Sequence, residues 1–133
     1  MFETEHSERT SLPASAVWAR WAKPARWSEW DSRVQHAESD GELAEGVAVR
    51  VKLRKGGATH HRVTALEPGE LLVTEYALPG GRVGHERRVQ ARGPGCEVTH
   101  RLYVDGPLWP LWALMLSRKR MRDTVAGFTD AQP

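Results

Sequence analysis

Turn signals recur at a regular spacing between residues 34 and 105, and this pattern constrains the fold more than any other feature of the chain. The signals are short stretches containing Gly, Pro or Asp at 40–41, 55–58, 67–70, 79–81 and 93–95. Such residues favour tight turns, and the runs between them are rich in residues that favour strands. Short strands joined by tight turns indicate an antiparallel meander. We expect strands over residues 34–39, 46–54, 59–66, 71–78, 82–91 and 96–105, with an edge strand over 2–10.

A segment in the last third of the sequence has helical periodicity instead. Apolar residues recur every three or four positions between Leu111 and Phe128, which is the spacing of one helix face. Pro110 has no N–H group and fits only in the first turn of a helix, where that donor has no partner anyway. We therefore expect a helix that starts near Pro107 or Leu108. With roughly 20 residues it would be about 30 Å long and could cross a small sheet.

Two shorter helical pieces, over residues 11–24 and 25–30, are expected to meet at Pro24. Ser11 is a candidate N-cap, Pro13 suits a first helical turn, and Pro24 ends the first piece. Together with the strands and the long helix, these pieces predict a single α+β domain over residues 1–133. The long helix is expected to pack on the apolar face of the sheet.

Side chains alternate along each strand, so pairing the hairpins assigns every residue to one of the two faces. The trial pairing has three pairs: Leu66 with Leu71, Leu78 with Val83, and Ala91 with Cys96. One face is then mostly apolar and carries Val47, Val49, Val51, Val63, Leu72, Leu78, Val83, Val89, Val98, Leu102 and Val104. The other face carries a row of charges that belongs in water, namely Arg62, Glu75, Glu86 and Arg101, with Glu75 beside Glu86.

The apolar face also carries a group of polar side chains: His61, Thr74, Tyr76, His85, Arg87 and His100, with His36 as a further candidate. The pairing puts Arg87 between Thr74 and His100. A buried Arg or His is costly unless it is paired, so we expect a cavity that holds water or a ligand with polar oxygens. The alternative is a one-residue slip in one hairpin, which would turn Arg87 outward and leave the histidines as ordinary core or rim residues.

The sequence supports few other site chemistries. His60 and His61 point to opposite faces of a strand, no Asp or Cys lies at ligand spacing, and Arg87 would repel a cation, so we expect no metal. No nucleophile elbow or glycine-rich phosphate loop is present, and we expect no cofactor. General acid–base chemistry stays open, because Arg87 beside His100 would keep that imidazole neutral near pH 7. The candidate catalytic residues are His100, His85 and Arg87.

Charge and cysteine content limit the partners and the compartment. The net charge is only +2 with both signs mixed, so we expect no nucleic acid. A single cysteine, Cys96, excludes an intrachain disulfide, and the polar first residues do not resemble a signal peptide, so we expect a cytoplasmic protein. The basic run at 117–122 follows two tryptophans, but a solvated helix face explains it better than membrane contact. The sequence is compatible with a homodimer.

A series of short motifs extends over nearly the whole chain: Pro13, Val17-Trp18 and Trp21-Ala22, then Trp27-Ser28-Glu29-Trp30-Asp31, Glu45-Gly46, Leu66-Glu67-Pro68-Gly69, and Thr99-His100 leading to Gly106-Pro107-Leu108. In order and spacing they resemble the START-like superfamily, also called SRPBCC, and its short members of polyketide cyclase/dehydrase type. The resemblance implies a helix-grip fold: a curved antiparallel sheet of about seven strands, two short helices after the first strand, and a long C-terminal helix packed on the sheet. It also implies a cavity between sheet and helix for a hydrophobic or amphipathic molecule, and it carries over no catalytic motif.

We therefore expect the protein to bind a small, largely apolar molecule that bears oxygen functions. The expected ligand-binding residues are Trp30, His61, Thr74, Tyr76, His85, Arg87, His100, Leu102, Trp112 and Met115. One alternative is a cyclase or dehydratase acting on a polyketide-like substrate, with His100 or His85 as base. Another is a membrane-associated lipid carrier that uses Trp109, Trp112 and the basic run.

Overall fold

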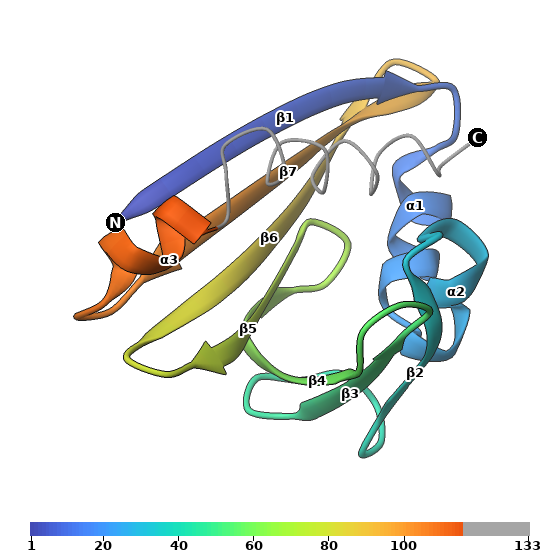
Figure 1. The fold of residues 1–133 in the computed structure, drawn as a ribbon. Coiled ribbons are helices and arrows are strands. Elements are labelled where there is room, and N and C mark those ends of the chain that lie inside the picture. Colours follow the sequence, from blue (N-terminus) through green and yellow to red (C-terminus); the bar gives the residue numbers. More distant parts are fainter. Residues whose placement is uncertain (116–133) are drawn as a thin grey trace.

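Seven strands form one antiparallel sheet in the order β1-β7-β6-β5-β4-β3-β2 (Figure 1). The structure is a computed structural model that describes residues 1–115. The strands are β1 (Phe2–Thr10), β2 (Val34–Ser39), β3 (Ala48–Leu53), β4 (Ala58–Glu67), β5 (Leu71–Leu78), β6 (Gly81–Arg92) and β7 (Gly95–Asp105). Strands β2 to β7 form the predicted meander, and β1 is the predicted edge strand beside β7.

The short helices follow β1 and lie on the concave side of the curved sheet (Figure 1). They are α1 (Ala14–Trp21), a 3₁₀ turn η1 (Pro24–Arg26) and α2 (Trp27–Trp30). Helix α1 contacts β6 and β7, whereas η1 and α2 contact β2. The predicted cap at Ser11 is wrong, because α1 begins later: Pro13 occupies the N-cap position, and its carbonyl oxygen accepts the N–H groups of Ala16 and Val17.

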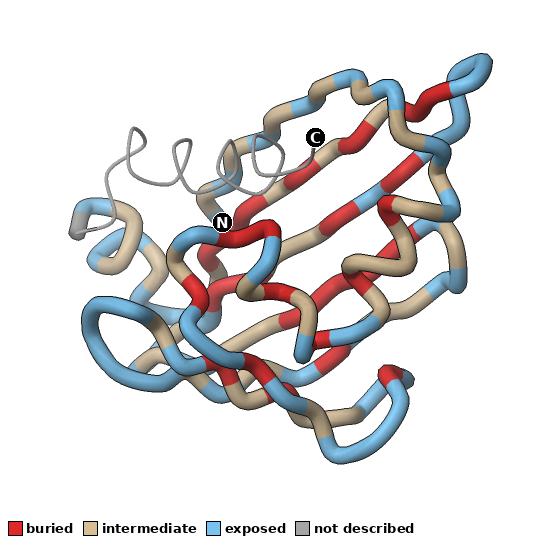
Figure 2. Tube along the Cα trace, turned by 90° about the vertical axis from the view of Figure 1, so that its right-hand side faces the viewer, coloured by how far each residue is buried: buried red, intermediate tan, exposed pale blue. Residues whose placement is uncertain are grey.

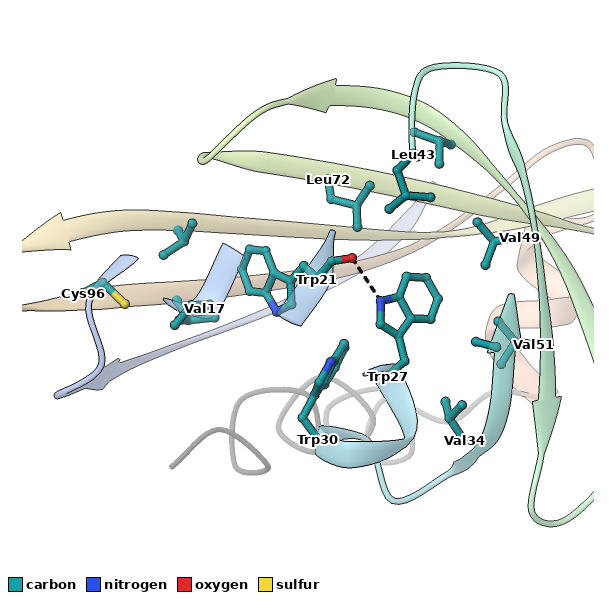
Figure 3. Close-up of a cluster of buried hydrophobic side chains, with 14 residues drawn as sticks. Val17, Trp21, Trp27, Trp30, Val34, Leu43, Val49, Val51, Leu72 and Cys96 are labelled. Atoms are coloured by element: carbon teal, nitrogen blue, oxygen red, sulfur yellow. Dashed lines mark hydrogen bonds between the residues drawn. The ribbon is translucent and has the colours of Figure 1, made fainter. Parts of the chain in front are cut away.

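Three indole side chains fill the space between the short helices and the sheet (Figure 3). Trp21 is fully buried, and Trp27 and Trp30 are nearly so. The Trp27 indole N–H donates to the carbonyl oxygen of Trp21 at 3.0 Å, and that of Trp30 donates to the carbonyl oxygen of Arg20 at 3.3 Å. Figure 2 shows buried positions alternating with exposed ones along the strands, as expected for a sheet with one covered face.

The pairing of β6 with β7 is as predicted. Ala91 lies opposite Cys96, and Arg87 lies opposite His100. Arg87 therefore faces the covered side of the sheet, where it is 2% exposed, and the alternative in which a register slip turns it outward is excluded.

The predicted pairing of β5 with β6 is wrong by two residues. Leu78 lies opposite Gly81, because the turn contains only two residues and Gly80 adopts a φ of 70° that a tight turn requires. A shift of two residues keeps every side chain on its predicted face but changes its neighbours. Arg87 consequently lies opposite Leu72 on β5.

The β4–β5 pairing is correct at one end and wrong at the other. Val63 lies opposite Thr74 as predicted, but a β-bulge follows Val63 and places Leu66 opposite Leu72 instead of Leu71. A bulge adds one residue to one strand only, so it changes the register part-way along the hairpin.

A second irregularity turns His36 away from the cavity. The pairing of β2 with β3 shifts between Val34 and His36, so Val34 is buried while His36 is exposed and lies 3.7 Å from Glu38. The placement of His36 on the inner face is therefore wrong.

The charged row on the outer face is partly as predicted. Glu86 lies opposite Arg101, but Glu75 lies opposite Gly84 and not beside Glu86. Tyr103 occupies the space above that glycine, where an added Cβ would overlap its ring, and its hydroxyl donates to the Glu75 carboxylate. The shifted register therefore separates the two glutamates that the trial pairing placed together.

The last described element is α3 (Trp109–Met115). Its first turn contains Pro110, and the carbonyl oxygen of Leu108 accepts the N–H groups of Leu111 and Trp112, so the predicted start of the helix is confirmed. The predicted continuation to Phe128 and the basic run lie outside the described residues. No helix within residues 1–115 is long and apolar enough to cross a membrane.

Candidate functional site

A cavity of about 410 Å³ lies on the concave side of the sheet beside α2. Its walls come from the connection between α2 and β2, the end of β3, and strands β4 to β7. The lining residues are Trp27, Asp31, Ser32, Arg33, Val34, Val51, Leu53, Arg54, Lys55, Thr59, His61, Tyr76, Val83, His85, Arg87 and Leu102. Trp27, Val34 and Val51, which Figure 3 labels within the hydrophobic core, also line this cavity.

Arg87 provides a cation at the buried end of the cavity. Its guanidinium carbon lies 5.2 Å from the Trp27 ring centroid and 5.9 Å from that of Trp30, within the range of a cation–π contact. Its Nη1 donates to the hydroxyl of Thr74 at 3.5 Å. Burial lowers the pKa of the Arg87 guanidinium to about 9, so the side chain remains charged at neutral pH.

Asp31 and Arg33 form an ion pair in the connection that follows α2. Asp31 is 2% exposed; its Oδ1 accepts the backbone N–H and the Nε–H of Arg33 at 3.0 and 3.1 Å, and its Oδ2 accepts Nη2 at 3.0 Å. The charges of this pair act on Arg87 in opposite directions, Asp31 raising its pKa and Arg33 lowering it. Arg33 thus pairs with Asp31, the one carboxylate among residues 1–115 that lines the cavity.

Two imidazoles and a phenol form a cluster on the inner face of β4 to β6. The ring centroid of His61 lies 4.9 Å from that of Tyr76 and 6.0 Å from that of His85. Burial, followed by the charge of Arg87, lowers the pKa of His61 to about 3 and holds the pKa of His85 well below its usual value. Burial also raises the pKa of Tyr76. All three side chains are therefore uncharged at neutral pH and can exchange hydrogen bonds with a ligand.

The structure brings five of the predicted ligand-binding residues to the cavity wall: His61, Tyr76, His85, Arg87 and Leu102. All five lie on the inner face of β4 to β7, as the sequence predicts, although the pairing of β5 with β6 is shifted by two residues.

Other predicted residues lie behind the wall or away from it. Thr74 and Trp30 contact Arg87 from the protein side. His100 is buried opposite Arg87, but its ring packs edge-on against Trp21 at 5.7 Å and does not line the cavity. Burial and the Arg87 charge also hold the pKa of His100 well below its usual value.

Trp112, one of the expected ligand-binding residues, does not line the cavity. Its indole N–H donates to the carbonyl oxygen of Pro79 at 2.8 Å, and its ring packs near Val83 and Leu102, two residues that do line the cavity. The pairing of this helix turn with the β5–β6 turn was not visible in the sequence, because it depends on the tight turn at Gly80. The side chain of Met115 lies outside the described residues.

Sequence reasoning missed the α2–β2 side of the cavity. Asp31 belongs to a motif that carried the family resemblance, yet its ion pair with Arg33 depends on how the chain leaves α2. Val51 was placed on the apolar face but not among the ligand-binding residues. Val34 could have been found as an inward-facing apolar residue, and Arg54 and Lys55 as cations at a turn. Within residues 1–115, no three His, Cys, Asp or Glu side chains gather in a group that could hold a metal ion.

Solved structures share this fold. The di-domain ARO/CYC BexL from the BE-7585A biosynthetic pathway gives a TM-score of 0.77 at 15% identity, covering 98% of this chain and 46% of its own. Truncated norcoclaurine synthase from Thalictrum flavum gives 0.73 at 14% identity, covering 98% and 89%. A START superfamily protein from Mycobacterium smegmatis gives 0.77 at 12% identity, covering 97% and 92%. The chain spans about half the length of the BexL chain, and at these identities the likeness establishes the fold alone.

The curved sheet of seven antiparallel strands with a helix after the last strand fits the helix-grip fold of these proteins. A comparison with curated proteins gave no match. The family model described as polyketide cyclase / dehydrase and lipid transport matches residues 1–131. The chain therefore belongs to the polyketide cyclase/dehydrase and lipid transport family.

Proposed function

We propose that this protein binds a small hydrophobic or amphipathic molecule bearing oxygen functions in the cavity beside α2. The observation that carries the proposal is Arg87, a cation only 2% exposed at the wall of a cavity of about 410 Å³. Burying a charge costs free energy, and a core that only stabilises the sheet has no need of a buried charge. A binding site gains from it, because a fixed cation orients a ligand oxygen.

The cavity has the composition of a small-molecule site. Its volume falls in the range of about 300–1,000 Å³ that such pockets occupy. Apolar side chains such as Trp27, Val51 and Leu102 supply contact area, and Arg87 and Tyr76 supply donors from the inner face of the sheet. Few polar groups in an apolar surround are the usual means by which a pocket combines affinity with orientation.

An uncharged fluorescent probe, N-phenyl-1-naphthylamine, tests whether the cavity takes an apolar molecule. We expect its fluorescence to rise on binding with one site per chain, since the cavity excludes water. In Val51→Phe the larger side chain takes up part of the cavity, and the affinity for the probe should fall at least about tenfold. The control is Lys52→Phe, which adds the same ring to an exposed neighbour on the other face. No binding to the unmodified protein, or equal binding to both variants, contradicts the proposal.

The second candidate function is a cyclase or dehydratase that uses a cavity histidine as base. The observation in its favour is that His85 lines the cavity with Tyr76 beside it, their ring centroids 6.1 Å apart. His100 does not reach the cavity, so the role of base passes to His85. A strongly lowered pKa, however, makes a neutral imidazole a weak base, and for this reason binding is the leading proposal.

Turnover of a poly-β-ketone thioester separates the two functions. An enzyme would lose at least about a hundredfold in kcat in His85→Gln, while the affinity for the probe stays within a few-fold. If His85→Gln lowers binding and turnover equally, or if the unmodified protein gives no turnover, the enzyme function is contradicted.

A further inference from the structure

We propose that Tyr76 is the specificity-determining residue of the cavity, where its hydroxyl donates a hydrogen bond to an uncharged acceptor oxygen of the ligand, such as the carbonyl oxygen of an apolar ring ketone. The inference rests on the proposed ligand-binding function and adds to it the residue that selects the ligand and the kind of oxygen that it selects. Three properties of Tyr76 support it: the position of the hydroxyl, the packing that fixes the ring, and the protonated state of the phenol.

The two tyrosines of the chain differ in what their hydroxyl groups contact. Tyr103 lies on the outer face of the sheet, and its hydroxyl donates to the Glu75 carboxylate. Tyr76 lies on the inner face of β5, where it is half-buried and lines the cavity, and no group within residues 1–115 forms a hydrogen bond with its hydroxyl. Nδ1 of the neighbouring His61 also has no partner among these residues, but protein atoms enclose it. The Tyr76 hydroxyl is therefore the group that a ligand can reach.

The Tyr76 ring is held in place by its neighbours. The His61 ring packs edge-on against it, with the centroids 4.9 Å apart and the planes at 65°, and the His85 ring centroid lies 6.1 Å away. His61 is itself held by Thr59, whose Oγ1 lies 2.8 Å from Nε2 of the imidazole. Tyr76 also packs against Val83. A donor on an immobilised ring loses little conformational entropy when a ligand binds, so its direction can discriminate between ligands.

The phenol stays protonated and acts as a donor. Burial raises the pKa of Tyr76, so its O–H group is present throughout the neutral range. The imidazoles beside it are uncharged there, because burial lowers the pKa of His61 to about 3 and holds the pKa of His85 well below its usual value. A ligand that fills the cavity without an acceptor oxygen would leave the O–H group without a partner, which weakens binding about five- to a hundredfold. Tyr76 thus favours ligands with an acceptor oxygen over hydrocarbons of the same shape.

Rigid ring ketones and their parent hydrocarbons test this selection. The pairs are 1-indanone with indane, 1-tetralone with tetralin, and 1-benzosuberone with benzosuberane, each titrated at pH 7.5 by displacement of N-phenyl-1-naphthylamine. The members of a pair have the same carbon skeleton and differ in the carbonyl group, and the three ring sizes place the oxygen at different positions. The measured quantity is the affinity of the ketone divided by that of its hydrocarbon.

Two variants with the same chemical change locate the selection. Tyr76→Phe removes one hydroxyl and keeps the ring, so the affinity ratio of the best-fitting pair should fall at least about threefold, the effect of one neutral hydrogen bond. Tyr103→Phe removes the same group on the outer face of the sheet, and its ratio should stay as in the unmodified protein. Comparing ratios cancels the general difference in hydrophobicity between ketone and hydrocarbon.

Nuclear magnetic resonance gives a second readout in the unmodified protein. Because the chain has only two tyrosines, labelling the tyrosine Cζ atoms with carbon-13 gives two signals, and Tyr103→Phe assigns them. The Cζ atom carries the hydroxyl and responds to its hydrogen bonding. The ketone should shift the Tyr76 signal more than the hydrocarbon does, and neither should shift the Tyr103 signal.

The outcomes separate this inference from the function on which it rests. A ratio that falls less than about threefold in Tyr76→Phe, or that falls equally in Tyr103→Phe, overturns the selection by Tyr76 and leaves ligand binding intact. The same holds if N-phenyl-1-naphthylamine binds and none of the ketones displaces it. If N-phenyl-1-naphthylamine itself does not bind, the proposed function fails and the inference fails with it. Should Tyr76→Phe not fold, the carbon signal decides, and equal shifts with ketone and hydrocarbon overturn the inference.

Discussion

The concave side of the sheet has two halves, one filled by side chains and one that leaves a cavity. Under α1 and α2 the space is filled by Trp21, Trp27 and Trp30, and the indole N–H groups of the last two donate to backbone carbonyls. Toward the end of β3 the sheet presents His61 and Arg87 instead, and a cavity of about 410 Å³ remains. The first half gains stability from burial. The second half is less tightly packed and keeps polar side chains at the cavity, as the proposed binding site requires.

Removing an indole from the filled half should have the largest effect. Trp21 is 0% exposed, so Trp21→Ala should lower the free energy of unfolding by about 3–5 kcal/mol, through lost burial and the void it leaves. Urea unfolding followed by circular dichroism measures the change. Trp112→Ala, at a half-buried indole, is the comparison and should lose less. A loss below about 1.5 kcal/mol for Trp21→Ala would show that the indoles do not form the stabilising core.

Lowering the pH should destabilise the protein, because the half that contains the cavity buries a neutral histidine. The pKa of His61 is about 3 in the folded protein against about 6.5 in the unfolded chain. The unfolded state therefore binds the extra proton between these values, so stability is full above pH 6.5 and is lost as the pH falls toward 3. Between pH 7 and 5, this histidine accounts for about 2 kcal/mol of the loss.

The variant His61→Gln should lack that part of the pH dependence. Urea unfolding at pH 7 and pH 5 gives the difference, and His60→Gln, at the exposed neighbour on the other face, should behave like the unmodified protein. Equal pH dependence of all three proteins would contradict the burial of a neutral imidazole at this position.

Replacing a valine by phenylalanine should lower the stability in the filled half and change it little beside the cavity. Val49 and Val51 lie on the same face of β3 and in the same buried cluster, but Val49 is 0% exposed and does not line the cavity, whereas Val51 does. Val49→Phe should lower the free energy of unfolding by about 1–3 kcal/mol because it overpacks the core. Val51→Phe should change it by less than about 1 kcal/mol. Similar losses for both would mean that the cavity is not open to a side chain.

The smallest effect on stability is expected at Arg87. Exchanging a buried cation for an apolar side chain of similar length is often neutral or stabilising, so Arg87→Met should leave the free energy of unfolding within about 1 kcal/mol of the original value or raise it. Thermal and urea unfolding both measure this. A loss above about 3 kcal/mol would instead assign Arg87 a structural role.

The sequence predicted the sheet well because its signals are local. A two-residue turn fixes the register of β6 and β7, and the pairing of Arg87 with His100 follows from it. The same reasoning placed Leu78 two residues away from its partner, because nothing in Pro79-Gly80-Gly81 reveals which glycine takes the left-handed conformation; the structure gives it to Gly80. Since side chains alternate with a period of two, that error left every cavity residue of β6 on the correct face.

The candidate site was harder to predict, because it depends on contacts between segments. His100 and Arg87 are neighbours across two strands, yet Trp21 covers His100 while Arg87 reaches the cavity. The pair Asp31–Arg33 forms where the chain turns from α2 into β2, a direction that no periodicity encodes. Which inward-facing polar residue meets the cavity was decided by where the indoles lie.

One measurement tests the central claim, that the hollow half holds a small molecule, most directly. Native mass spectrometry is applied to a mixture of the unmodified protein and Val51→Phe, which differ in mass, first as purified and then during titration with 2-naphthoate. Any molecule that co-purifies and any added ligand should appear as a single adduct on the unmodified protein, with little on Val51→Phe. Equal adducts on both proteins, or none on either, would contradict the account.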